Sequence, residues 1–529
     1  MRSLKLLSSA ALLSFGLAAA AGADPTSPIT VVAAPEDQGE RHVPATRATT
    51  GLLQDYVEEE YFVSGLADIY THGNPAVPGE VLIQPTNATF AQTEDIPYTT
   101  RIIVRRPANV EDFTGTVVVE WWNSTAGFDT APVYDPIAEF IAREGWAFVG
   151  ITNSTTSIEF LTVGCEAFGF PLFDCQTRYA ALDFPANGLA YDIVSQIAHM
   201  LKNPDDPANP LPAGFTVERL YHAGQSQQGG SMVTYATNFH FAANDAYFVQ
   251  AAGSARPINF GPSCDGEGAP AYPECTPRLS GSDRLVATDL PVPVLRTLTE
   301  TDVGGTLAAG LRQTDTDNFR YYEIAGASHV TVHKGIEVPV LNVLLEDWCL
   351  NEMNTLADGE VIGAFPQRAM WKNLDDFVRH GTPMPAGLVL DSADAVISRS
   401  FLGNAMGGVR TTDMDVPIAR YEPNNTFDPS LPAVIHDIAN LACRLSGSTF
   451  RFGSGANTAL WVDHAGYVAE VEAAADQLVA ERFLLPEDAD LLVLRAWLSD
   501  PPFDTSCGLG FELVLVLPPL LYLKRRRKA

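Results

Sequence analysis

The chain has 529 residues, of which 46% are hydrophobic, so it is long enough to bury a large core. Its 64 acidic and 33 basic residues give a net charge of −31. This balance argues against nucleic acid as a partner, because phosphate binding requires clustered lysine and arginine side chains. Acidity fits a soluble protein outside the cell, and a surface charged only for solubility explains it equally well.

The first 23 residues, 1–23, are typical of a secretory signal peptide. A positively charged start precedes an apolar stretch over residues 6–20, and a small-residue cleavage site ends at Ala23. The alternative is an uncleaved membrane anchor. Residues 24–50 are polar and rich in Pro and Thr, which predicts a flexible lead-in.

After the lead-in, short β-branched and aromatic segments alternate with amphipathic ones. The expected strands are 56–65, 100–107, 115–122, 145–152, 219–224, 246–253, 293–300 and 319–326. The expected helices between them are 134–145, 188–203 and 228–239. This alternation predicts an α/β fold with a mostly parallel central sheet flanked by helices. The continuous apolar character of 115–122 and 145–152 fits strands buried on both faces.

The C-terminal third contains helical segments without a clear second series of strands. Residues 367–381 and 468–483 carry the strongest helical patterns. We therefore interpret this part as a C-terminal helical elaboration of one domain that covers residues 51–499, followed by a linker at 500–506.

The last residues, 507–529, combine an apolar stretch with a basic end. This arrangement is typical of a membrane segment whose basic end stays on the cytoplasmic side. The apolar part is shorter than the roughly 20 residues of a stable span, which suits a sorting signal that is later processed. The tail resembles C-terminal surface-sorting tails of Gram-negative bacteria, and the alternative is a buried helix. We expect an exported bacterial protein, in the periplasm, on the cell surface or outside the cell, with the tail as its membrane contact.

The seven cysteines suggest disulfide bonds, since thiols pair outside the cytoplasm. The spacing suggests these pairs: Cys165 with Cys175, Cys264 with Cys275, and Cys349 with Cys443. Cys507 is left over at the start of the tail. The sequence alone does not decide the pairing, and no cysteine or histidine cluster has zinc spacing.

The segment RLYHAGQSQQGG, residues 219–230, places Ser226 directly after an expected strand and before an expected helix. A serine on such a turn is exposed and strained, and the helix N-terminus directs backbone N–H groups at the reacting centre. The usual motif has a second glycine two residues after the serine. Here that position is Gln228, so the motif alone is weak evidence.

The rest of a catalytic triad follows in the expected order. A serine nucleophile needs a histidine base, and the base needs an acid that holds its tautomer. In this type of sheet the chain order is serine, acid, histidine, each at a strand exit. Ser226, Asp302 and His329 meet this requirement. Asp302 is favoured over Glu300 because it lies farther past the strand, and His333 is the alternative base.

An oxyanion site needs two backbone donors. One is expected from Gln227, and the second from Asn123 or Ser124 in the loop after the expected strand 115–122. Three aromatic residues near this loop are candidates for a substrate pocket, with core packing as the alternative: Trp121, Trp122 and Phe128.

Four stretches resemble the bacterial alpha/beta hydrolase domain family, within the α/β-hydrolase superfamily: 117–127, 178–196, 299–329 and 402–421. The resemblance covers roughly residues 50–490. It implies the α/β-hydrolase fold, a Ser-His-acid site and ester hydrolysis, with no metal or organic cofactor. The chain departs from the family at Gln228, where a small side chain is usual.

These observations predict a secreted or surface-tethered serine hydrolase, most simply a carboxylic ester hydrolase that forms an acyl-enzyme on Ser226. Its substrate would be a small-molecule or polymeric ester. An amidase or peptidase of the same fold is one alternative, because leaving-group preference depends on pocket shape. A catalytically inactive surface binding module is the other, and Gln228 is its main support. The sequence defines neither the ester nor the oligomeric state.

Overall fold

The structure is a computed structural model that describes residues 28–34, 47–48, 55–72, 83–85, 95–164, 175–239, 243–256, 285–308, 310–330, 336–337, 341–354, 362–499, 501 and 503. The predicted signal peptide and C-terminal tail lie outside these residues, as do most of the lead-in and linker. Four of the cysteines and the alternative base are also outside: Cys165, Cys264, Cys275, Cys507 and His333.

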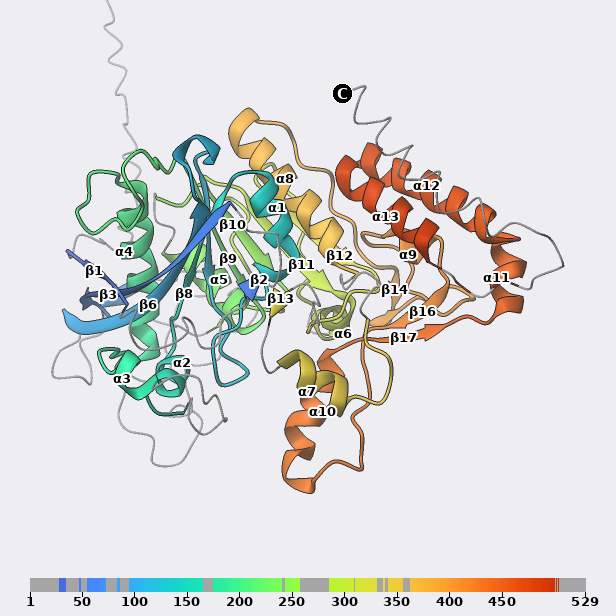
Figure 1. The fold of residues 1–529 in the computed structure, drawn as a ribbon, viewed down its shortest axis with the longest axis horizontal. Coiled ribbons are helices and arrows are strands. Elements are labelled where there is room, and N and C mark those ends of the chain that lie inside the picture. Colours follow the sequence, from blue (N-terminus) through green and yellow to red (C-terminus); the bar gives the residue numbers. More distant parts are fainter. Residues whose placement is uncertain are drawn as a thin grey trace, which may run out of the picture.

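A nine-stranded sheet forms the centre of the molecule (Figure 1). In spatial order its strands are β1 (Thr30–Ala33), β3 (Tyr56–Ala67), β6 (Ile96–Pro107), β8 (Ala147–Ile151), β7 (Thr116–Trp121), β9 (Arg219–Gln225), β10 (Ala246–Gln250), β11 (Val294–Thr299) and β12 (Phe319–Ile324). The strands from β8 to β12 are parallel, whereas β1, β3 and β6 pair antiparallel at one edge. The predicted mostly parallel sheet is therefore confirmed.

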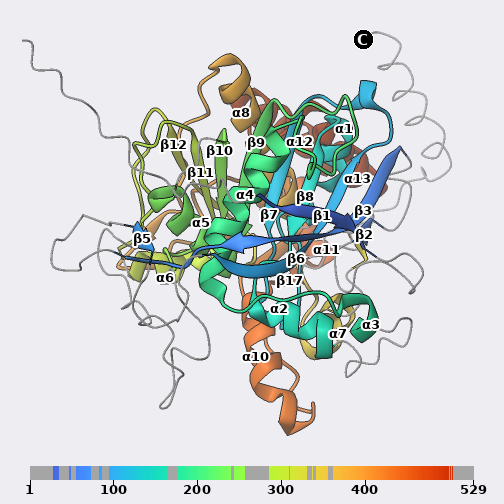
Figure 2. The same cartoon turned by 90° about the vertical axis from the view of Figure 1, so that its left-hand side faces the viewer.

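Helices cover both faces of this sheet. In Figures 1 and 2, α4 (Ala190–Lys202) and α5 (Gln227–Asn238) lie on one face, and α1 (Ala138–Arg143) and α8 (Ala364–His380) lie on the other. Every residue of β7 and β8 is buried, as expected for parallel strands covered on both sides. Trp371 of α8 contributes to this cover, because its ring lies 4.6 Å from that of Phe248 in β10.

The C-terminal part is mainly helical, which confirms the predicted elaboration. It contains α9 (Thr412–Asp415), α10 (His436–Leu445), α11 (Ser454–Trp461), α12 (His464–Glu481) and α13 (Pro486–Leu498), with a hairpin of β16 (Ala419–Glu422) and β17 (Ser448–Arg451). Figure 1 shows α12 and α13 side by side, and α10 projecting away from the sheet beside α7 (Leu341–Trp348). One hydrophobic cluster contains core residues from Ala34 to Leu492. The domain boundaries at 51 and 499 stay a prediction.

The remaining elements are short. The other strands are β2 (Arg47–Ala48), β4 (Tyr70–His72), β5 (Ile83–Pro85), β13 (Ile336–Glu337), β14 (Ser392–Ala393) and β15 (Val396–Ile397). The other α-helices are α2 (Thr155–Glu159), α3 (Cys175–Tyr179) and α6 (Glu300–Ala308). Single helical turns of other types are η1 (Val110–Asp112), η2 (Asp135–Ile137), η3 (Phe160–Gly164), η5 (Asn187–Leu189) and η8 (Ala433–Ile435). Within the described ranges, no helix is both long and apolar enough to cross a membrane.

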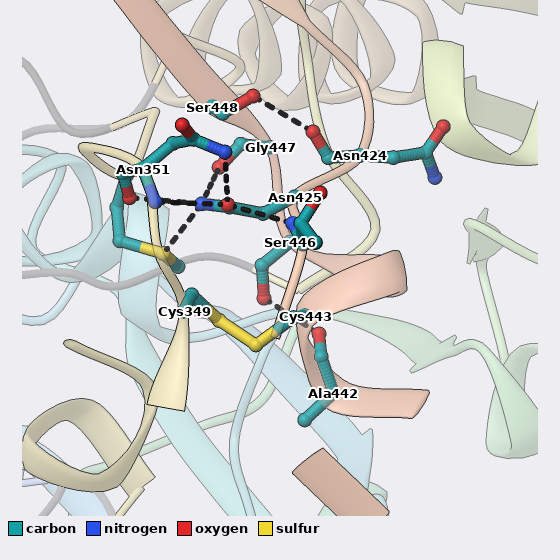
Figure 3. The surroundings of a disulfide bond; sticks show 11 residues. Cys349, Asn351, Asn424, Asn425, Ala442, Cys443, Ser446, Gly447 and Ser448 are labelled. Carbon is teal, nitrogen blue, oxygen red and sulfur yellow. Dashed lines mark hydrogen bonds between the residues drawn. A yellow bond between two sulfur atoms is a disulfide. The ribbon is translucent and has the colours of Figure 1, made fainter. Parts of the chain in front are cut away.

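A disulfide bond joins Cys349 to Cys443 across 94 residues of sequence (Figure 3). Cys349 directly follows α7, and Cys443 lies within α10. The predicted long-range cysteine pair is therefore present, and it connects the two helices that project from the sheet.

Candidate active site

Ser226 occupies the turn between β9 and α5. Its backbone angles, φ 56° and ψ −117°, are unusual for a residue with a side chain. The turn is held by two hydrogen bonds, from the Ser226 N–H to the Gln250 carbonyl at 2.9 Å and from the Gly230 N–H to the Ser226 carbonyl at 2.9 Å. Such strain persists only where the surroundings enforce it, and it is concentrated at functional sites.

Gly224 and Gly229, rather than residue 228, allow the start of α5 to pack closely against the strands at this turn. A Cβ atom on Gly224 would lie 2.6 Å from the carbonyl oxygen of Gln228, and one on Gly229 would lie 2.6 Å from that of Gln250. The Gln228 side chain is fully buried, and its Oε1 accepts a hydrogen bond of 2.9 Å from the Ser231 hydroxyl. Gln228 is therefore packed inside the first turn of α5, with one of its two polar atoms hydrogen-bonded.

We expect Gly224→Ala to destabilise the protein by about 1–3 kcal/mol, because the added methyl group overlaps backbone atoms that cannot rotate away. Gly304→Ala is the matched control, since a Cβ there meets no atom within 4 Å. Chemical denaturation of both variants and the wild type measures the difference. Equal stability of the two variants would show that the helix does not depend on Gly224 for its close approach.

Ser226, His329 and Asp302 form a continuous chain of hydrogen bonds. The Nε2 atom of His329 lies 2.7 Å from the Ser226 Oγ, and its Nδ1 atom lies 2.5 Å from Asp302 Oδ1. Asp302 Oδ2 accepts hydrogen bonds from the N–H and the hydroxyl of Thr299, at 3.1 and 2.6 Å. The three residues follow β9, β12 and β11, so the sheet brings together side chains that are far apart in the sequence.

Glu300, the alternative acid, has other partners. Its carboxylate is buried, and it accepts a 2.8 Å hydrogen bond from the Gly326 N–H and a 2.7 Å bond from Arg399 Nη2. Burial raises the pKa of Glu300, and the guanidinium of Arg399 opposes this shift. The structure thus places Asp302, rather than Glu300, against His329.

Two histidines near Ser226 have opposite electrostatic surroundings. Burial acts to lower the pKa of His329, but the charge and hydrogen bond of Asp302 outweigh it and raise that pKa above its ordinary value. His222, inside β9, has the Asn244 side chain as its hydrogen-bond partner, and burial lowers its pKa to about 4. His222 is therefore a neutral core residue, whereas a positive charge on His329 is stabilised.

The predicted oxyanion donors are only partly available. Gln227 is the first residue of α5, so its N–H has no acceptor within the helix. The N–H of Asn123, however, donates to the Thr130 carbonyl at 3.1 Å, which excludes Asn123 as a backbone donor. Its side-chain amide instead holds the loop to β9, with a 3.1 Å hydrogen bond to the Gln225 carbonyl. This correction leaves the Ser124 N–H as the loop candidate.

Ser226 and His329 both line a cavity of about 260 Å³. Of the three predicted aromatic residues, Phe128 lines it. Trp121 and Trp122 were wrong candidates, because they are 0% and 1% exposed and pack in the core. Trp121 stacks edge-on against Tyr191 at 5.2 Å, and Trp122 fills the space beside Gly150, where a Cβ atom would lie 2.0 Å from its ring.

The sequence reasoning missed one wall of this cavity. This wall consists of residues from α7 and α10: Leu345, Trp348, Ile438, Leu441, Ala442 and Leu445. The signal was present in the sequence, since the four positions from α10 recur at helical spacing and form one apolar stripe. Nothing in that stripe, however, indicates which cavity it faces.

The profile of the family described as alpha/beta hydrolase domain matches residues 32–494. No curated protein sequence matches the chain at a significant level. Solved structures with similarity include a hyperthermophilic esterase from the archaeon Pyrobaculum calidifontis, which is 14% identical and has a TM-score of 0.23, with 42% of this chain and 70% of that chain covered. One of two fungal esterases from Rhizomucor miehei is 14% identical with a TM-score of 0.25, covering 51% and 75% of the two chains. A glucuronoyl esterase from Teredinibacter turnerae is 13% identical with a TM-score of 0.24, covering 50% and 68%.

Proposed function

Because the chain belongs to the alpha/beta hydrolase domain family, we propose that it is a serine hydrolase that cleaves carboxylic esters. The observation that carries this proposal is the hydrogen-bonded chain from Ser226 through His329 to Asp302, with contacts of 2.7 and 2.5 Å, at the wall of a cavity. A serine activated by a histidine, which an acid orients in turn, is the arrangement that nucleophilic acyl transfer requires.

In the proposed reaction, the Ser226 Oγ attacks the acyl carbon of the ester while its proton passes to Nε2 of His329. Asp302 stabilises the resulting imidazolium. The N–H groups of Gln227 and Ser124 receive the negative charge on the carbonyl oxygen, and each such donor lowers the barrier by roughly 3 kcal/mol. His329 then protonates the leaving alcohol, and water repeats the sequence to release the acid.

We place this reaction outside the cytoplasm. The positive start and apolar stretch of residues 1–23 support export, and the disulfide between Cys349 and Cys443 suits an oxidising compartment. The basic end of the tail at 507–529 supports a membrane contact.

Labelling of the purified full-length protein with a fluorophosphonate tests the proposal, together with hydrolysis of p-nitrophenyl esters from acetate to palmitate. Esters are the expected substrates because they need less activation than amides, so the matching p-nitroanilides are measured in parallel. Faster cleavage of the anilides would favour an amidase. Absence of both labelling and hydrolysis would favour a binding module instead.

A further inference from the structure

We infer that α7 and α10 form a hydrophobic cap that binds a hydrocarbon arm of the ester, with a reach of about eight carbons. This inference rests on the proposed function, because it names the substrate class of the same site. The cap is defined as residues 341–348 of α7 and 436–445 of α10, together with the disulfide between Cys349 and Cys443.

The cavity face of α10 is apolar along its whole length. Ile438, Leu441, Ala442 and Leu445 all line the cavity that contains Ser226. Their spacing of three, four and seven residues places them on one side of the helix. Seven residues at a rise of about 1.5 Å span ~10 Å, which is the length of an extended hydrocarbon chain of roughly eight carbons.

Part of this apolar surface is exposed in the described part of the chain. Ile438 is 52% exposed and Leu441 is 53% exposed, although both line the cavity. Leu345 of α7, which also lines the cavity, is fully buried. Exposed apolar surface inside a cavity favours an apolar ligand, because contact with the ligand removes that surface from water.

The cap is attached firmly to the site. The disulfide joins its two helices, and the N–H of Val330, the residue after His329, donates to the Leu445 carbonyl at 2.8 Å. Figure 3 shows a second attachment at Asn425, which is 5% exposed. Its N–H donates to the Cys443 carbonyl at 2.9 Å, and its side-chain amide donates to the Asn351 carbonyl at 3.0 Å.

Polar side chains from other elements also line this cavity. Thr125, Gln225 and Gln250 line it, and the Gln250 amide donates to the Gln367 side chain at 3.3 Å. The cavity therefore combines the apolar face of the cap with a few polar side chains from other elements. An ester with one hydrocarbon arm matches this combination, whereas a uniformly polar ester would leave the cap without a partner.

The test is the chain-length profile of kcat/KM for two series, p-nitrophenyl esters of increasing acyl length and alkyl acetates of increasing alcohol length. Because the cap stays partly open to water, each added methylene is expected to raise kcat/KM by roughly twofold in one of the series, up to about eight carbons. In the double variant Ile438→Ser/Leu441→Ser, the octyl-to-short-chain ratio should fall about tenfold. Asn440→Ser, an exposed neighbour outside the cavity lining, should keep the wild-type ratio.

A flat profile in both series, or a ratio that the double variant leaves unchanged, would overturn the cap as a hydrocarbon site even if short esters are cleaved. Failure of the proposed function gives a different result, namely no hydrolysis and no fluorophosphonate labelling. In that case the affinity for a dansyl-labelled fatty acid is measured instead of turnover. Weaker binding to the double variant than to Asn440→Ser would support the cap, and equal binding would overturn it.

Discussion

Ser226→Ala is expected to lower kcat/KM for p-nitrophenyl esters by about 10⁴- to 10⁶-fold, because it removes the nucleophile while the other groups of the site remain. The Oγ atom lies 2.7 Å from the His329 base, so the loss is chemical rather than structural. The residual rate would come from the oxyanion donors and from binding alone. Labelling by a fluorophosphonate should disappear with the hydroxyl.

Ser226→Gly separates catalysis from backbone strain. Both variants lack the hydroxyl, but only glycine adopts φ 56° without a steric cost. We therefore expect the glycine variant to be more stable than the wild type by roughly 1 kcal/mol in chemical denaturation, and equally inactive. If Ser226→Ala kept wild-type esterase activity, the nucleophile would have to be another residue.

The sequence predicted the sheet well because its strands carry a strong physical signal. β7 and β8 were expected from continuous apolar runs, and both are buried along their whole length. The helix expected at 188–203 is α4, Ala190–Lys202. Its apolar residues recur at helical spacing, and most of the helix is buried. The strand β6 was expected from residue 100 but begins at Ile96, and its start was missed because Pro97 and polar Thr99 interrupt the apolar pattern.

The sequence predicted which strand ends carry the residues of the candidate site, but not the detailed surroundings of those residues. Chain order placed Ser226, Asp302 and His329 at the same edge of the sheet, and the structure brings them into contact. Neighbouring details depend on local geometry that spacing does not encode. Trp121 and Phe128 are both aromatic, both near the loop and both buried in the core, yet of the two Phe128 alone lines the cavity.

The cap could not be read from the sequence, because its two helices are brought together by long-range contacts. Cys349 and Cys443 are 94 residues apart, and Asn425 is buried against segments on either side of that gap. The cysteine pair was predicted from the sequence, but the helix α10 was not. Where they dock depends on long-range contacts, such as the hydrogen bond between Val330 and Leu445, which no periodicity predicts.

Asp302→Asn should reduce kcat/KM by about 10⁴-fold and also move the acidic limb of its pH profile. His329 acts as a base only when it is neutral, so kcat/KM rises with pH through the pKa of His329 in the free enzyme. In the wild type, burial acts to lower the pKa of His329, but Asp302 raises this pKa by more than burial lowers it. The acidic limb of the pH profile therefore lies above the ordinary histidine pKa. The asparagine removes the negative charge beside His329 but leaves the imidazole buried. The acidic limb should therefore shift to lower pH, while the plateau value of kcat/KM falls.

Glu300→Gln is the matched control for this shift. Glu300 is also a buried acid after β11, but its hydrogen bonds go to Gly326 and Arg399 rather than to His329. We therefore expect this variant to keep the wild-type limb, although the loss of the ion pair with Arg399 lowers its stability. A limb that stays in place in Asp302→Asn, or that moves in Glu300→Gln, would assign the orienting acid to the other carboxylate. The two profiles together thus locate the charge that the histidine depends on, because a carboxylate in contact with the imidazole shifts its titration far more than a more distant one.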